Sequence, residues 1–146
     1  FDDDELVSYG KWTSKGNHST ERISLTKGWV ASMIKKWQPD EVIFEDITIK
    51  FKDQGEAVLT YKKLAHLQGV LKNYCYEAGI HYQVVPPATW RKYSEIKGKS
   101  RLDKKKNAQL KIKKIYDINI DIDTAEAILI GAWAVENHKK YKIIKF

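Results

Sequence analysis

The chain has 146 residues, enough for one domain with a hydrophobic core and too few for a multidomain machine. Its 26 Lys and Arg outnumber its 19 Asp and Glu, and the net charge of +7 favours a polyanionic partner such as nucleic acid. The single cysteine, Cys75, excludes an internal disulfide and a Cys-rich zinc site, and no apolar run approaches the roughly 20 residues of a membrane span. We therefore expect a soluble protein of a reducing compartment that binds nucleic acid.

The positive charge is concentrated in residues 91–114. Eleven Lys and Arg side chains lie in this segment with two acidic ones, whereas the two signs nearly cancel elsewhere. Lysine contacts phosphate without reading bases, so we expect binding that depends on salt and responds to the shape and charge of the nucleic acid. The side chains expected to make these contacts are Lys97, Lys99, Arg101, Lys104, Lys105, Lys106 and Lys111.

The first predicted elements are a hairpin arm, a helix and a strand. Residues 2–5 are all acidic and are predicted to form a turn, and Leu6–Trp12 alternates loosely, as expected of the second arm of a hairpin whose first arm would lie before Phe1. Apolar residues keep helical spacing over Ile23–Trp37, until a Gln-Pro-Asp triplet stops them. Val42–Phe44 is a short apolar run that ends in Glu45, which is typical of a strand covered on both faces.

The remaining elements are a loop, a long helix, a strand and three more helices. The loop is expected at 50–56, the long helix over 57–78 and the strand over 80–84. The later helices are expected at Pro87–Tyr93, around Ala108–Ile115 and from Asp123 onward. Trp29, Trp37, Trp90 and Trp133 fall on apolar helix faces and are expected in the core. This order indicates one α/β domain over residues 1–146.

Three acidic residues could carry chemistry: Glu45 at the end of the central strand, and Asp123 and Glu126 at the start of the last helix. Asp-x-x-Glu before an apolar run is also the pattern of a capping box, which would give the second and third acids a purely structural role. If the three carboxylates meet, their mutual repulsion would be relieved by a hard divalent cation, and oxygen-only ligands favour Mg²⁺ or Mn²⁺ over zinc.

Five segments, in their order along the chain, resemble the RuvC family of Holliday junction resolvases, particularly its divergent phage-type members. The segments are Gln38-Pro39-Asp40 with Val42-Ile43-Phe44-Glu45, Leu64-Ala65-His66-Leu67-Gln68-Gly69, Glu77-Ala78-Gly79-Ile80, Leu102-Asp103-Lys104 and Asp123-Thr124-Ala125-Glu126-Ala127. The resemblance runs from about Leu6 to His138.

This resemblance implies an RNase H-like fold with a mixed central sheet flanked by helices. It further implies a homodimer that nicks two like strands of four-way or branched DNA with Mg²⁺, or with Mn²⁺ in its place, in the cytoplasm of a bacterial cell or a phage-infected host. The family's metal-binding acids fall on Glu45, Asp123 and Glu126, and its basic residue beside the scissile phosphate falls on Lys104.

The chain departs from the family pattern in two places. Glu126 stands where the family usually has aspartate, so its carboxylate reaches about one bond further and could bind metal directly or through water. The family's remaining catalytic aspartate lies on a first strand, and by resemblance Phe1 falls after that strand. We expect the intact protein to carry roughly 15–20 further residues upstream.

Two other functions fit the same residues. A non-catalytic module on this fold would bind branched DNA or RNA, and a different RNase H-like nuclease would act on RNA–DNA hybrids. Phe51, in the loop after Glu45, could act as a wedge against the bases of a junction.

Overall fold

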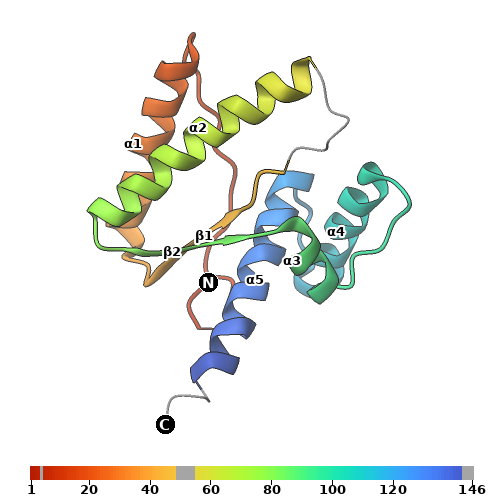
Figure 1. The fold of residues 1–146 in the computed structure, drawn as a ribbon. Coiled ribbons are helices and arrows are strands. Elements are labelled where there is room, and N and C mark those ends of the chain that lie inside the picture. The colour runs from red at the N-terminus through yellow and green to blue at the C-terminus, as the bar shows by residue number, and fades with distance from the viewer. Residues whose placement is uncertain (4, 49–54, 143–146) are drawn as a thin grey trace. The chain divides into compact units, whose positions relative to one another are not determined.

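The computed structural model describes residues 1–3, 5–48 and 55–142, and for residues 139–142 it describes the backbone alone. Within these residues the elements are α1 (Ser19–Trp37), β1 (Glu41–Glu45), α2 (Glu56–Glu77), β2 (His81–Val85), α3 (Pro87–Tyr93), α4 (Arg101–Tyr116) and α5 (Ile122–Lys142) (Figure 1). The α/β arrangement expected from the sequence is confirmed.

The chain divides into two compact units. One consists of residues 12–86 and holds α1, β1, α2 and β2; we call it the sheet unit. The other consists of residues 1–11 and 87–146 and holds α3, α4 and α5; we call it the helical unit.

The sheet unit is built on two parallel strands. β1 pairs with β2 in a register that places Glu41 opposite His81 and Glu45 opposite Val85. Parallel neighbours need a long crossover, and α2 provides it by packing on β2 and on α1. Among the described residues the sheet has these two strands, so it is smaller than the expected mixed sheet. Every residue of β1 is half-buried, and the expected cover on both faces is therefore wrong.

Asp2 and Glu5 pair across a turn, and Leu6–Trp12 does not form the expected strand. The turn is confirmed by an antiparallel bridge in which the amides of Asp2 and Glu5 bond to each other's carbonyl oxygen at 3.0 and 2.9 Å. Leu6–Trp12 then continues as irregular backbone. A strand needs a ladder of backbone bonds to a neighbour, and beyond this bridge the described residues provide none for the segment.

Two tryptophans expected in the core lie at the surface. Trp29 and Trp37 are 37% and 47% exposed, whereas Trp90 is fully buried as expected. Trp29 stacks on Trp12 with ring centroids 5.4 Å apart. The surface of α1 and α2 also exposes Leu25, Leu59, Leu64 and Tyr76. The apolar faces of these two helices are thus larger than their mutual packing covers.

The helical unit is organised around α5, which packs against α4 and α3 (Figure 1). Its residues 127–134 are all apolar, as expected of a helix enclosed by others. The buried side chains around it are Trp90, Ala108, Ile112, Ala125, Ile128, Leu129 and Ala134. Since apolar contact decides which face of α4 meets α5, it also decides which lysines of α4 point to the start of α5.

The basic segment before α4 is fixed to that helix by hydrogen bonds. Asn107 Nδ2 donates to the carbonyl of Lys97 at 2.7 Å, and Ser100 and Asp103 cap the first turn reciprocally. Gly98 packs so closely that a Cβ there would come within 2.8 Å of the backbone nitrogen of Lys104. This close approach explains why a residue without a side chain stands at position 98.

Candidate metal and phosphate site

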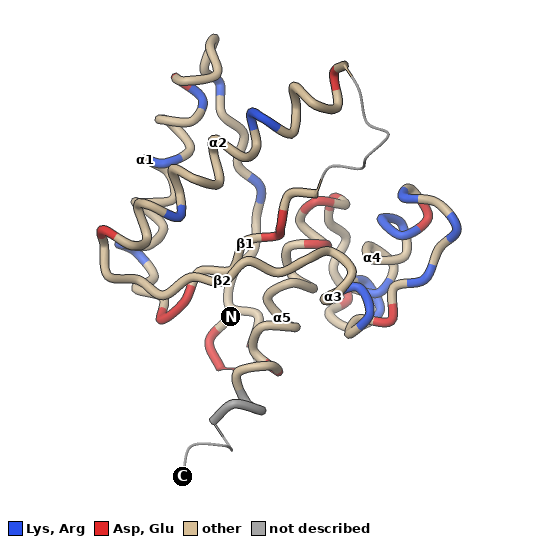
Figure 2. The backbone as a smooth tube through the Cα atoms, viewed as in Figure 1, with Lys and Arg blue, Asp and Glu red and all other residues tan. Residues whose placement is uncertain are grey.

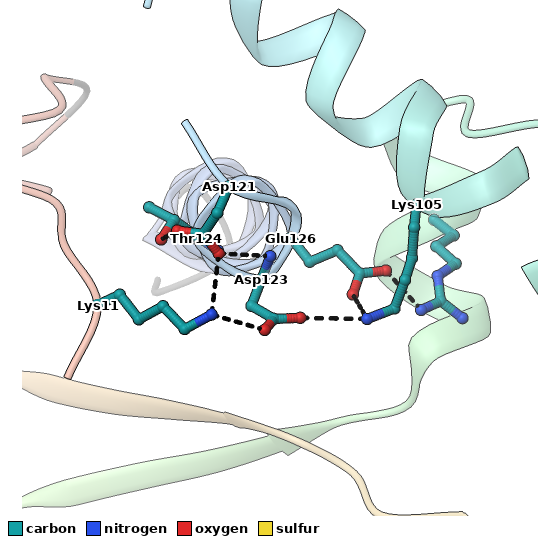
Figure 3. Close-up of polar contacts among 7 residues, drawn as sticks. Lys11, Lys105, Asp121, Asp123, Thr124 and Glu126 are labelled. Atoms are coloured by element: carbon teal, nitrogen blue, oxygen red, sulfur yellow. Dashed lines mark hydrogen bonds and ion pairs between the residues drawn. The ribbon is translucent and has the colours of Figure 1, made fainter. Parts of the chain in front are cut away.

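The N-terminus of α5 is capped by Asp121. Its Oδ1 accepts hydrogen bonds from the backbone amides of Asp123 and Thr124 at 3.0 and 3.2 Å, and its Oδ2 accepts one from the Thr124 hydroxyl at 2.6 Å (Figure 3). These bonds hold the pKa of Asp121 below its usual value, with the Thr124 hydroxyl as the main cause. The capping role considered for Asp123 and Glu126 therefore belongs to Asp121, and the capping-box interpretation of that pair is wrong.

Asp123 lies in the first turn of α5 with its carboxylate between two lysines. Lys105 Nζ donates to Oδ1 at 3.1 Å and Lys11 Nζ donates to Oδ2 at 3.2 Å (Figure 3). The bond from Lys105, followed by that from Lys11, lowers the pKa of Asp123. The helix N-terminus adds to this stabilisation because its partial positive charge favours an anion. Asp123 thus presents an ionised, exposed carboxylate.

Glu126 lies one turn later and is almost entirely buried. Its side chain is 10% exposed, and Arg91 Nη2 donates to its Oε1 at 2.8 Å. Lys105 Nζ lies 3.6 Å from the other oxygen, Oε2. The spacing of three residues places Asp123 and Glu126 on the same side of α5, as expected from the sequence. Lys105 is therefore shared by both carboxylates.

Lys105 occupies the face of α4 that packs on α5. It precedes the buried residues Ala108 and Ile112 by three and seven positions, which is the helical spacing of a single stripe. The resemblance assigned the basic residue of the site to Lys104; in this structure Lys105 is hydrogen-bonded to Asp123 and ion-paired with Glu126. The same spacing is visible in the sequence, so this placement could have been predicted from it.

Arg91 is a site residue that the sequence analysis did not single out. It follows the buried Trp90 on α3, and its guanidinium lies 4.8 Å from the centroid of that ring. Stacking on the indole and pairing with Glu126 together fix the guanidinium in the helical unit. An arginine in a basic segment reads as a solvated charge, and no local pattern marks this one as the partner of a buried acid.

Glu45 belongs to the sheet unit. It ends β1, as expected, and Gln68 Nε2 of α2 donates to its backbone carbonyl at 3.0 Å. Its side chain is half-buried at the carboxyl end of a parallel strand, where α/β proteins commonly place functional groups. Phe51, considered as a wedge, lies outside the described residues.

The basic residues expected to contact nucleic acid fall into three groups. Figure 2 shows Lys and Arg gathered along α4 and the segment before it. Lys105 is committed to Asp123 and Glu126, and Lys111 donates to the carbonyl of Ser94 at 2.6 Å. Lys104 is half-buried. The exposed members of the set are Lys97, Lys99, Arg101 and Lys106. These four are the side chains best placed to reach a phosphate backbone.

The start of α5 carries several carboxylates. In this structure lysine and arginine side chains form ion pairs with Asp123 and Glu126. Across residues 1–3, 5–48 and 55–142, no three His, Cys, Asp or Glu side chains form a group that could hold a metal ion. The same residues include no helix long and apolar enough to cross a membrane.

The fold is similar to that of RuvC from Thermus thermophilus. The structure of Thermus thermophilus RuvC aligns with a TM-score of 0.63 and 16% identity over 88% of this chain and 76% of that one. T. thermophilus RuvC in complex with a Holliday junction substrate aligns with a TM-score of 0.61 and 16% identity over 86% and 76%. No protein-family model matches the chain, and no curated protein matches it in sequence. The likeness shows a RuvC-like fold.

Proposed function

We propose that this protein is a metal-dependent, structure-selective DNA endonuclease that cleaves Holliday junctions or other branched DNA, as a divergent, phage-type relative of RuvC. The observation that carries the proposal is the pair Asp123 and Glu126. Because Asp121 caps α5, neither carboxylate serves as the cap, and both lie beside a strongly basic helix in a RuvC-like fold. One solved RuvC is bound to a Holliday junction, which makes that substrate the first to test.

The metal that we propose for this site is Mg²⁺ or Mn²⁺. Glu45, Asp123 and Glu126 would hold the metal through carboxylate oxygens, which hard cations prefer. Asp123 is suited to this role because its side chain is 62% exposed and ionised. When bound, the cation would activate a water and stabilise the leaving oxygen of a phosphodiester.

The chain's own cations would bind and orient the DNA. Lys97, Lys99 and Arg101 precede or open α4, and Lys106 is exposed on it. Such side chains neutralise phosphates and carry no base information, so the preference would be for branched shape over sequence. Lys104, half-buried on the same helix, would steady negative charge at the scissile phosphate.

A homodimer would supply the two sites that paired nicks require. Cyclic two-fold symmetry places identical sites so that two like strands can be cut in one complex. The exposed Leu25, Trp29, Trp37, Leu59, Leu64 and Tyr76 on α1 and α2 support this part of the proposal, because a second subunit would bury them.

A non-catalytic module that binds branched DNA is the second candidate. The observation in its favour is that Arg91 and Lys105 already compensate Glu126, so folding does not require a metal there. Such a module would bind a junction and leave it intact.

The test is cleavage of labelled four-way junction, linear duplex and RNA–DNA hybrid by the protein, with Mg²⁺ and with EDTA. We expect the protein to cleave the junction with Mg²⁺ and not with EDTA. The variants Asp123→Asn and Glu45→Gln should bind the junction but no longer cleave it. Asp117→Asn is the matched control. Asp117 is exposed to solvent, and its backbone has a left-handed conformation that asparagine also adopts. Binding without cleavage by the unaltered protein identifies the binding module, and preferred cleavage of the hybrid identifies the other nuclease.

A further inference from the structure

The Lys105 ammonium lies between the two carboxylates at the start of α5. Its ammonium is 3.1 Å from Asp123 Oδ1 and 3.6 Å from Glu126 Oε2 (Figure 3). The other oxygen of each acid has another partner: Asp123 Oδ2 bonds to Lys11 and Glu126 Oε1 bonds to Arg91. Withdrawal of this one side chain would thus release one oxygen on each acid and leave the remaining contacts in place.

The contact is built into the packing of the helical unit. The Lys105 side chain is 22% exposed and that of Glu126 is 10% exposed, whereas Lys11, on the far side of Asp123, is 51% exposed. Lys105 emerges from the face of α4 that buries Ala108 and Ile112, so its stem is directed toward α5. Partial removal from water also weakens screening of the charges, which strengthens their attraction.

A metal ion and this ammonium would exclude each other. Magnesium binds oxygen at about 2.1 Å, so both carboxylates would close around the ion in the space that the ammonium now occupies. The metal ion and the Lys105 ammonium would repel each other strongly if both stayed in this partly desolvated site. Arg91 would keep Glu126 oriented during the exchange because it holds the other carboxylate oxygen.

We propose that Lys105 is a resident cation that competes with the catalytic metal for Asp123 and Glu126 and is released when the metal binds. This inference rests on the proposed function for the identity of the site. The lysine stabilises the metal-free protein by neutralising two neighbouring acids. Once displaced, its ammonium is free to contact a DNA phosphate, so metal binding and phosphate binding support each other.

The test is the affinity of the protein for Mn²⁺ alone, measured by electron paramagnetic resonance without DNA. Lys105→Met keeps the length of the side chain and removes its charge, so we expect Mn²⁺ to bind tighter by about fivefold or more. Lys113→Met is the matched control, since it removes the same charge from an exposed position of α4. Adding Asp123→Asn to Lys105→Met should abolish the gain.

A second readout uses the unaltered protein and does not depend on the folding of a variant. Acetylation of each lysine by an amine-reactive reagent is followed by mass spectrometry with and without Mn²⁺. We expect modification of Lys105 to rise when Mn²⁺ is added and that of Lys113 to stay constant.

The outcomes separate this inference from the proposed function. If Mn²⁺ binds but its affinity is the same in Lys105→Met and Lys113→Met, or Lys105 stays protected, the competition is overturned and the metal site remains. If neither the unaltered protein nor Lys105→Met binds Mn²⁺, both the metal site and the competition are overturned.

Discussion

Each acidic residue at the start of α5 has a different set of partners. Asp121 accepts three bonds from its own helix, Asp123 lies between two lysines, and Glu126 pairs with Arg91 and Lys105. Three carboxylates so close in sequence would repel one another without these partners. Asp121 therefore caps the helix, whereas Asp123 and Glu126 are held by side chains from outside α5.

The cap can be tested by substituting Asp121. Alanine leaves the amides of Asp123 and Thr124 without this acceptor, so we expect Asp121→Ala to lower the free energy of unfolding by about 1 kcal/mol. Asp121→Asn keeps an acceptor and should retain most of that stability. Urea denaturation measures both variants, and equal losses in the two would contradict the capping role.

The ion pairs of Asp123 make stability depend on acid. The pKa of this carboxyl is lowered in the folded protein, mainly by the bond from Lys105 and then by that from Lys11. Its contribution is therefore complete above the unfolded pKa of about 3.9 and is lost as pH falls toward the lower folded pKa. In EDTA, the urea midpoint of Asp123→Asn should change less between pH 6 and pH 3 than that of the unaltered protein. Equal changes would show that the pairs do not stabilise the fold.

The candidate acids could be predicted from the sequence, but their partners could not. Asp123 and Glu126 stand out because a spacing of three puts them on one helical face before an apolar run. That pattern does not exclude capping, and Asp121 is a second residue of a type that favours the N-cap position. The residue at which the backbone enters the helix decides between them. The bond from Arg91 depends on how α3 packs against α5.

At the scale of elements, α4 presents lysines with two roles. Lys105 and Lys111 are bonded within the helical unit, while Lys106 is exposed. The helix itself could be predicted because its apolar spacing is regular. The strand predicted at Leu6–Trp12 was wrong because a strand depends on a neighbouring strand, and alternation within one segment does not specify that neighbour.

These two roles predict different effects of neutralising a lysine. Lys106→Ala should reduce the slope of log binding constant against log salt concentration by about 0.9 on duplex arms, with stability unchanged. Lys111→Ala removes the donor to the Ser94 carbonyl, so it should lower the free energy of unfolding by about 1–2 kcal/mol. Fluorescence anisotropy over a salt series and urea denaturation distinguish them. If Lys106→Ala left the salt slope unchanged, this result would argue against α4 as part of the DNA interface.

At the scale of the whole molecule, the exposed apolar side chains of α1 and α2 predict self-association. Leu59 is 56% exposed, so Leu59→Glu should not disturb the packing within the sheet unit and should convert a dimer to a monomer. Lys62→Glu, also exposed on α2, is the control for the added negative charge. Sedimentation velocity measures the mass of each variant. An unaltered protein that sediments as a monomer at high concentration would contradict the dimer.

We propose that Asp123 and Glu126 form a divalent-cation site whose place Lys105 holds in the metal-free protein. Anomalous diffraction from crystals grown with saturating Mn²⁺ tests it most directly. We expect a manganese peak bonded to Asp123 Oδ1 and facing Glu126 Oε2, with the Lys105 ammonium withdrawn from both. Crystals in which Lys105 still bridges the two carboxylates and no manganese contacts Asp123 would contradict the claim.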